Sequence, residues 1–303
     1  MGSELVIEAE DLVKDYGKTR ALAGVSLSVN RGEVFGFIGP NGAGKSTTIR
    51  ILLDLLRPTA GRVEVFGRSP RKGGPELRGR VGYLPGELVL PPRRRAGEYL
   101  AHLAKLRGGA GADRIEPLAK RFRLELDKPI KSLSKGNKQK VGVVQAFMHR
   151  PELLILDEPT SGLDPLLQQD VMDMVVQASQ EGSTVFMSSH VLSEVEEVAG
   201  RVGVIRAGRM VDVAELSDLR RRAGQWVEFR FAAPVSAEEF TRLAGVSDVE
   251  VADHTVTCLL QGEPNALLKT AARHHVTGWS ARDRDLEELF FDLYRSEEGS
   301  NVR

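Results

Sequence analysis

The chain has 303 residues, and its 42 Lys plus Arg equal its 42 Asp plus Glu, so the formal net charge is zero. This length allows one large domain plus a small one. The charge balance argues against a general nucleic-acid coat or a polyanion binder, although a local basic patch is compatible with it. No apolar run approaches the ~20 residues of a membrane helix, and the first residues do not read as a signal peptide.

Short apolar runs alternate with helical patterns through the first two-thirds of the chain. The expected strands are Leu5–Glu8, Val25–Val29, Val34–Ile38, Val63–Phe66, Val81–Leu84, Leu153–Leu156, Thr184–Ser188 and Val202–Arg206. The expected helices are Ser46–Leu56, Ala96–Arg107, Arg114–Phe122, Lys135–His149, Leu166–Gln180 and Leu192–Val198. This alternation predicts an α/β fold with a largely parallel sheet, and the early Glu-rich strands suggest a smaller antiparallel flank.

Two further segments complete the predicted organisation. From about 87 to 149 the strand pattern disappears, which indicates an α-helical subdomain inserted into the sheet domain. A boundary near Leu219–Gly224 divides the chain into residues 1–219 and 220–303. The second part is expected to be a small α+β, ferredoxin-like module. Its expected elements are strand Val227–Phe231, helix Ala237–Leu243, strands Val249–Val251 and Thr255–Leu260, helix Asn265–His274, strand Thr277–Ala281 and helix Asp285–Tyr294.

The single cysteine, Cys258, lies in an apolar strand pattern of the second part. It cannot form an internal disulfide. We interpret it as a small buried hydrophobe in a protein of the reducing cytoplasm.

A glycine-rich loop carries the strongest local motif. It reads Gly39-Pro40-Asn41-Gly42-Ala43-Gly44-Lys45-Ser46-Thr47, which matches G-x-x-x-x-G-K-[ST]. The expected strand before it and helix after it supply the context of a phosphate-binding loop. Its glycines let backbone N–H groups turn toward phosphate oxygens, and the helix N-terminus adds partial positive charge. Lys45 should reach the β- and γ-phosphates, and Ser46 should ligate Mg²⁺.

Two adjacent carboxylates follow the apolar run Leu153–Leu156, which has the composition of a strand buried on both faces. Open α/β sheets place their ligands at the carboxyl ends of the strands, where Asp157 would emerge. We expect Asp157 to hold Mg²⁺ through water and Glu158 to be the general base that polarises the attacking water. His190 ends the next buried strand, where it could hydrogen-bond both the γ-phosphate and the base.

Two polar turns flank this strand in the sequence. Ser134-Lys135-Gly136-Asn137 stands at the head of a predicted helix, a setting that suits an anion. Ser161-Gly162-Leu163-Asp164 follows the carboxylates. Together with the phosphate loop, these features predict an ATPase that closes its active site with a second copy of itself.

Over roughly residues 4–215, these motifs and their order resemble the nucleotide-binding subunit of ABC transporters, a P-loop NTPase with a RecA-like core. The resemblance implies a head-to-tail dimer in which Ser134, Gly136 and Asn137 face the ATP of the partner copy. It also implies that Asp164 lies at the dimer interface, and that Tyr16 stacks on adenine. The implied cofactors are ATP and Mg²⁺. The implied partner is a membrane permease on a separate chain, contacted from the cytoplasmic face of the cell membrane.

Three positions depart from the family pattern. Lys135 and Asn137 replace a glycine and a glutamine of the usual signature, and Lys135 could add a cation close to phosphate. Gly86 stands where the family has a glutamine that contacts Mg²⁺, and we consider Glu87 as its substitute. The combination resembles a branch of the family associated with drug, antibiotic or lipid export in bacteria, and the C-terminal module resembles a domain found on that branch.

The sequence leaves several alternatives open. The run Arg93-Arg94-Arg95 is either a solvated face or an electrostatic contact with the permease or anionic headgroups. A soluble ABC ATPase acting on the ribosome or nucleic acid is the second hypothesis, although the charge balance and the single cassette count against it. A nucleotide sensor that does not hydrolyse ATP is suggested by Gly86 alone. The apolar stripe of Asp285–Tyr294 would dock on the module or on a partner.

Overall fold

The computed structural model describes residues 4–284, and the chain divides into two compact units between Ala214 and Glu215. The strands of the first unit are β1 (Leu5–Tyr16), β2 (Thr19–Asn30), β3 (Val34–Ile38), β4 (Ala60–Val65), β5 (Val81–Leu84), β6 (Leu153–Asp157), β7 (Thr184–Ser189), β8 (Arg201–Arg206) and β9 (Arg209–Glu215). Its α-helices are α1 (Lys45–Leu52), α2 (Pro70–Gly79), α3 (Ala96–Leu106), α4 (Ile115–Arg121), α5 (Lys135–Phe147), α6 (Pro165–Gln180) and α7 (Leu192–Glu196). The predicted helix Asp285–Tyr294 lies outside the described residues.

A six-stranded sheet is the centre of the first unit, in the order β5-β6-β7-β3-β8-β9. The pairings β5–β6, β6–β7, β7–β3 and β3–β8 are parallel. Parallel strands are covered by helices on both faces, which explains why β3, β6 and β7 are buried throughout. Since the strands are parallel, the carboxyl ends of β3, β6 and β7 meet at one edge, and the functional loops start there.

The antiparallel flank is a three-stranded sheet in the order β2-β1-β4. β1 and β2 are each twelve residues long, more than the predicted Leu5–Glu8 and Val25–Val29, because bulges let the ladder continue through polar positions. Helix α1 packs against β2, β4 and β6, so it lies between the two sheets. The α/β fold predicted for the first part of the chain is therefore confirmed.

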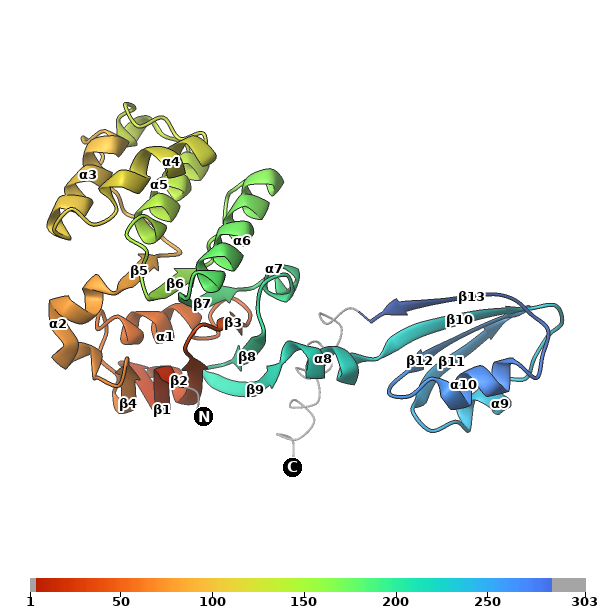
Figure 1. Ribbon diagram of the computed structural model, residues 1–303. Helices are drawn as coiled ribbons and strands as arrows, with labels where there is room; N and C mark the ends of the chain where they lie inside the picture. Colours follow the sequence, from red (N-terminus) through yellow and green to blue (C-terminus); the bar gives the residue numbers. More distant parts are fainter. Residues whose placement is uncertain (1–3, 285–303) are drawn as a thin grey trace. The chain divides into compact units, whose positions relative to one another are not determined.

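The segment predicted as helical contains α3, α4 and α5, with short 3₁₀ turns at Ala112–Arg114 and Ile130–Ser132. Figure 1 shows these three helices gathered together, on the side of the sheet where β5 is the edge strand. Helix α5 also packs on β5, which ties the helical segment to the sheet. The sequence pattern missed α2, where Pro75 and a kink at Gly74 conceal a helix anchored by buried Leu77. It also missed β9.

The second unit contains helix α8 (Leu216–Ala223), which includes part of the predicted boundary region. It continues with β10 (Gln225–Phe231), α9 (Glu238–Thr241), β11 (Val246–Ala252), β12 (Thr255–Leu260), α10 (Asn265–Ala271) and β13 (Val276–Asp283). The sheet order is β11-β12-β10-β13, and every pairing is antiparallel. Its core includes Phe229, Phe231, Phe240 and Cys258, and burial raises the pKa of the Cys258 thiol to about 11.

Candidate active site

The phosphate-loop motif connects β3 to α1, as the sequence predicted. Gly44 caps the helix with φ at 113°, a conformation that glycine adopts readily and other residues rarely do. A Cβ there would lie 2.7 Å from Leu22 Cδ2 and 3.0 Å from the carbonyl oxygen of Ala21. The loop therefore needs glycine at this position for both its turn and its packing on β2.

Lys45 is the first residue of α1, and its side chain is only 5 % exposed. Its Nζ donates to the carbonyl oxygen of Gly39 at 2.6 Å and lies 3.7 Å from Glu158 Oε1. Burial lowers the pKa of Lys45, while the charges of Glu158 and Asp157 oppose that shift. A buried cation at the head of a helix is a suitable partner for a phosphate group.

Asp157 ends β6 and is 4 % exposed. The hydroxyl of Ser188, on the neighbouring β7, donates to its Oδ1 at 2.5 Å. A Cβ built on Gly86 would lie 3.3 Å from Oδ2 of the same carboxylate. One oxygen is thus held by a donor, and the other faces a residue without a side chain. With the hydroxyl of half-buried Ser46, this donor set fits the hard oxygen ligands that Mg²⁺ prefers.

Glu158 follows with φ at 50°, in the left-handed region that is strained for a non-glycine residue. Its backbone N–H donates to the Ser188 carbonyl at 3.1 Å, which holds this turn against β7. His190 Nδ1 lies 3.2 Å from Glu158 Oε1, the oxygen that also faces Lys45. The structure thus brings together Lys45 from the start of α1, Glu158 from the turn after β6 and His190 from the turn after β7.

Sequence reasoning missed a second carboxylate beside this cluster. Glu194 on α7 accepts from Thr160 Oγ1 at 2.6 Å and from Ser189 Oγ at 2.7 Å. Ser189 Oγ in turn accepts from the backbone N–H of Val191 at 2.9 Å. A cavity of about 240 Å³ is lined in part by Glu158, His190 and Glu194. The only signal in the sequence was a Glu four residues after His190.

The turn Ser134–Asn137 heads α5. Ser134 caps the helix, and its Oγ accepts from the backbone N–H of Asn137 at 3.2 Å. A Cβ on Gly136 would lie 2.9 Å from the carbonyl oxygen of Gly162. Buried Gln139, one turn further on, donates to the Pro159 carbonyl at 3.1 Å. The head of α5 is therefore packed on the loop that follows the carboxylates.

The loop Ser161–Asp164 leads into α6. Asp164 caps that helix, and its Oδ1 accepts from the Leu167 N–H at 3.1 Å. The backbone N–H of Ser161 donates to the Glu158 carbonyl at 3.1 Å, and Leu163 is 8 % exposed. A Cβ on Gly162 would lie 3.4 Å from Cε of Lys135. The loop is thus fixed on one side to Glu158 and on the other to the head of α5.

Glu87 and Tyr16 have exposed side chains. Glu87 follows Gly86 directly and is exposed. Tyr83, three residues before Gly86, has its pKa raised to about 12 by burial and by the Asp157 charge. The pairing of Leu84 with Leu156 brings the end of β5 next to the end of β6, where Asp157 lies. Tyr16 ends β1 with 45 % of its surface exposed and with the Lys14 ammonium 5.3 Å from its ring centroid. An exposed ring at a strand end is accessible for stacking on a base.

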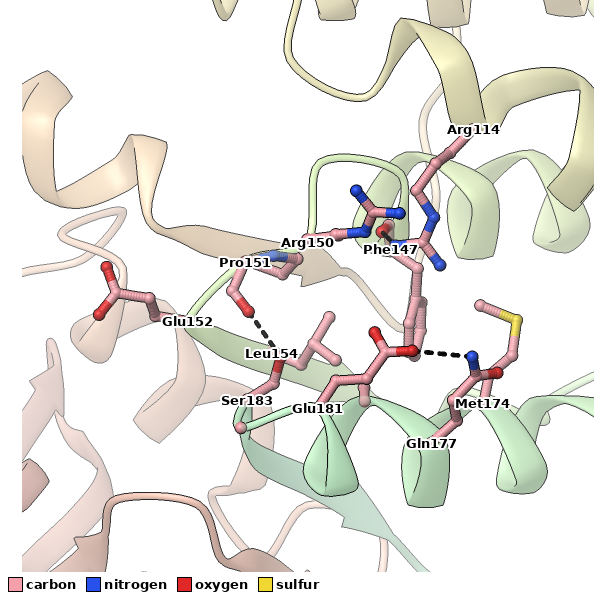
Figure 2. A pocket seen from close by; sticks show the side chains of 12 residues that line it. Arg114, Phe147, Arg150, Pro151, Glu152, Leu154, Met174, Gln177, Glu181 and Ser183 are labelled. Carbon is pink, nitrogen blue, oxygen red and sulfur yellow. Dashed lines mark hydrogen bonds between the residues drawn. The ribbon is translucent and has the colours of Figure 1, made fainter.

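A separate cavity of about 150 Å³ lies at the amino ends of β6 and β7, away from these groups (Figure 2). Arg114 and Arg150 line it on one side and Glu181 on the other, and Phe147 and Leu154 also line it. The Glu181 carboxylate accepts from Gln177 Nε2 at 2.9 Å. Because the predicted phosphate and metal groups all lie at the carboxyl ends of the strands, this cavity is not the candidate site.

Comparison with known proteins gives consistent matches. The family described as "ABC transporter" matches residues 22–161. The chain is 37 % identical to the bacitracin transport ATP-binding protein BcrA of Enterococcus faecalis, over 84 % of this chain and 83 % of that protein. It is 33 % identical to the linearmycin resistance ATP-binding protein LnrL of Bacillus subtilis, over 95 % and 98 %. A solved structure of the ATP-binding subunit of an ABC transporter matches with a TM-score of 0.67 and 33 % identity, over 71 % of this chain and 92 % of that one.

Proposed function

The chain belongs to the ATP-binding subunits of ABC transporters and is an ATP hydrolase of that type, and from this premise we propose that it energises the export of a drug, antibiotic or lipid through a permease on a separate chain. The relatives named above are described by bacitracin transport and linearmycin resistance, which supports the direction of transport. Neither description supports action on the ribosome or on nucleic acid.

One observation carries the catalytic assignment: Lys45 and His190 both approach Oε1 of Glu158, at 3.7 and 3.2 Å. In our proposal Lys45 binds the β- and γ-phosphates, and its present bond to the Gly39 carbonyl is exchanged for phosphate. Glu158 accepts the proton of the attacking water, and His190 orients Glu158 and the γ-phosphate. The remaining loop residues, Gly39 to Gly44 and Thr47, wrap the phosphates, and all of them except Pro40 carry a backbone N–H group that can donate to a phosphate oxygen.

Mg²⁺, when bound, neutralises charge on the β- and γ-phosphates. Ser46 and Asp157 would hold it, and Ser188 keeps the Asp157 carboxylate oriented through its hydroxyl. Tyr16 would stack on adenine.

The protein acts, in this proposal, as a head-to-tail homodimer that closes on two ATP molecules. Ser134, Lys135, Gly136 and Asn137 face the partner's ATP, and Ser161 to Asp164 lie at the dimer interface. The packing of Gly136 and Lys135 on Gly162 supports this arrangement, because it makes the two segments one continuous surface. ATP binding favours the closed state and hydrolysis releases it, which drives the permease by differential binding.

The proposed contact with the permease is the segment that follows Gly86. This segment would lie at the cytoplasmic face of the membrane. Val89 is 86 % exposed, and Arg93 and Arg94 are exposed. Arg95 is exposed as well, but its guanidinium donates to the Asp127 carbonyl at 3.1 Å. Among residues 4–284, no helix is both long and apolar enough to cross a bilayer. Reversing Arg93 and Arg94 to Glu should weaken co-purification with the permease, and undiminished assembly and transport would remove this contact from the proposal.

The experiment that tests the proposed function is Glu158→Gln. This variant should bind ATP with unchanged affinity, hydrolyse it at least about 10²-fold more slowly, and accumulate as an ATP-bound dimer in size-exclusion chromatography. The exposed carboxylate Glu116, replaced by Gln, is the matched control. Wild-type turnover in Glu158→Gln would overturn the assignment of the base.

A further inference from the structure

The hydrogen bonds of Glu194 connect two segments of the active site that the sequence separates. Thr160 belongs to the loop between Glu158 and Ser161–Asp164, and Ser189 immediately precedes His190. Both hydroxyl-bearing residues are buried, at 3 % and 1 % exposure. Each donates to a different oxygen of the same carboxylate, at 2.6 and 2.7 Å. Glu194 therefore bridges the loop that follows the catalytic base to the strand end that carries the histidine.

We propose that Glu194 is a positioning residue, which sets the distance between His190 and Glu158 and transmits movement of the Ser161–Asp164 loop to that pair. The inference rests on the proposed roles of Glu158 and His190, and it adds a connection to the loop assigned to the dimer interface.

Geometry supports the bridge at both ends. The Ser189 hydroxyl accepts from the Val191 N–H while it donates to Glu194, so the backbone on both sides of His190 is tied to one hydroxyl. On the other side, the backbone N–H of Leu163 donates to the Thr160 carbonyl at 3.0 Å, and Ser161 N–H donates to the Glu158 carbonyl. A displacement of Ser161–Asp164 must consequently move Thr160, and through Glu194 it reaches Ser189.

The burial of Thr160 and Ser189 makes the bridge through Glu194 rigid. Charge-assisted hydrogen bonds are about twice as strong as neutral ones, and a buried hydroxyl without a partner is costly. His190 itself is exposed at 47 % of its side chain, so its own surface packing does not fix it. The strand end before it and the bridge to Glu194 must supply its orientation. Misplacement of a catalytic group by about 1 Å costs on the order of 10²-fold in rate.

The test measures ATP affinity and turnover separately in the full chain. Glu194→Ala should lower kcat on the order of tenfold or more while the Kd for ATP stays within about twofold, because the phosphate loop is untouched. Glu194→Gln should recover much of the rate, since its amide can accept from one hydroxyl and donate to the other. The control Glu197→Ala removes an exposed carboxylate just after α7 and should leave kcat unchanged.

A double-mutant cycle tests whether Thr160 and Glu194 affect turnover through the same hydrogen bond. Thr160→Val keeps the shape of the side chain and removes only the donor to Glu194. If the bridge acts as one unit, Thr160→Val combined with Glu194→Ala should be no slower than Glu194→Ala alone. Additive losses, or full activity in Glu194→Ala, would overturn the inference. A parallel Glu158→Gln variant keeps the two proposals separable: if it is inactive while Glu194→Ala is normal, only the bridge fails.

Discussion

His190 Nδ1 lies 3.2 Å from Glu158 Oε1, although 32 positions separate the two residues in the chain. The contact exists because β6 and β7 are adjacent and parallel, with Asp157 paired to Ser188, so that both residues leave the sheet at the same edge. This distance makes His190 well placed to orient Glu158, the proposed base.

His190→Ala should reduce ATP hydrolysis about 10²-fold or more, because Glu158 loses the partner that orients it and the γ-phosphate loses a donor. ATP affinity should change little, since Lys45 and the loop remain. Turnover and equilibrium binding of a fluorescent ATP analogue are the measurements. His275→Ala, in the second unit, is the matched control, and equal activities of the two variants would contradict the role of His190.

Ser188→Ala should raise the Mg²⁺ concentration that the reaction requires. The variant removes the hydroxyl that donates to Asp157 Oδ1 and leaves the carboxylate free to turn. Loss of such a supporting donor typically weakens metal affinity by about 10-fold or more. The Mg²⁺ concentration for half-maximal ATPase activity measures the effect. Ser183→Ala, just before β7, removes a donor to the Pro151 carbonyl and should leave that concentration unchanged.

Glu87→Ala tests whether Glu87 supplies the contact that Gly86 lacks. Gly86 lies against the Asp157 carboxylate, and exposed Glu87, which follows Gly86 directly, is the nearest acidic residue along this segment. We expect the half-maximal Mg²⁺ concentration to rise several-fold, on the order of the tenfold loss seen for supporting groups. Glu116→Ala serves as the control. An unchanged Mg²⁺ titration in Glu87→Ala would eliminate Glu87 as the substitute.

Gly44→Ala should impair both stability and nucleotide binding. The new Cβ would stand 2.7 Å from Leu22 Cδ2, and φ of 113° is strained for alanine. A strained residue of this kind costs about 1–3 kcal/mol, to be read from the midpoint of urea unfolding. Gly17→Ala provides the comparison, because Gly17 also has positive φ but a methyl group added there would meet no atom within 4 Å. If Gly44→Ala and Gly17→Ala lost the same stability, the packing of Gly44 on Leu22 would not contribute to it.

The lowered pKa of His149 predicts how the stability of the folded protein depends on pH. Burial, followed by the charge of Arg107, lowers its pKa from 6.5 to about 4, and its Nε2 lies 3.2 Å from the Val81 carbonyl oxygen. The unfolded chain therefore takes up a proton below about pH 6.5, while the folded chain does so only near pH 4. Stability should fall as the pH drops through this window.

The loss attributable to His149 should be on the order of 1–2 kcal/mol, after discounting the full shift for solvent screening. His149→Gln keeps a donor toward Val81 but cannot titrate, so its unfolding free energy should depend less on pH between 6.5 and 4. Urea unfolding at several pH values measures both proteins. Parallel curves over the whole window would show that His149 does not contribute.

The local sequence pattern was sufficient to predict a large part of the fold and to select the candidate residues of the site. The strand–loop–helix around Lys45 and the buried run before Asp157 are contiguous in sequence, and their chemistry depends on neighbours along the chain. The confirmed α/β class follows from the same regularity. Element ends were less accurate: α1 ends at Leu52 rather than Leu56, and β1 runs to Tyr16 because a bulged ladder tolerates polar residues.

The sequence by itself therefore determined which residues are candidates for phosphate and carboxylate chemistry, since spacing and residue type specify a loop or a strand end. Only the tertiary structure decided which of them meet. The Thr160–Glu194–Ser189 bridge, the approach of Gly86 to Asp157, and the packing of Gly136 on Gly162 join residues from different elements. Such contacts depend on the order of strands in the sheet and on side-chain packing within a few ångströms, which no local pattern along the chain encodes.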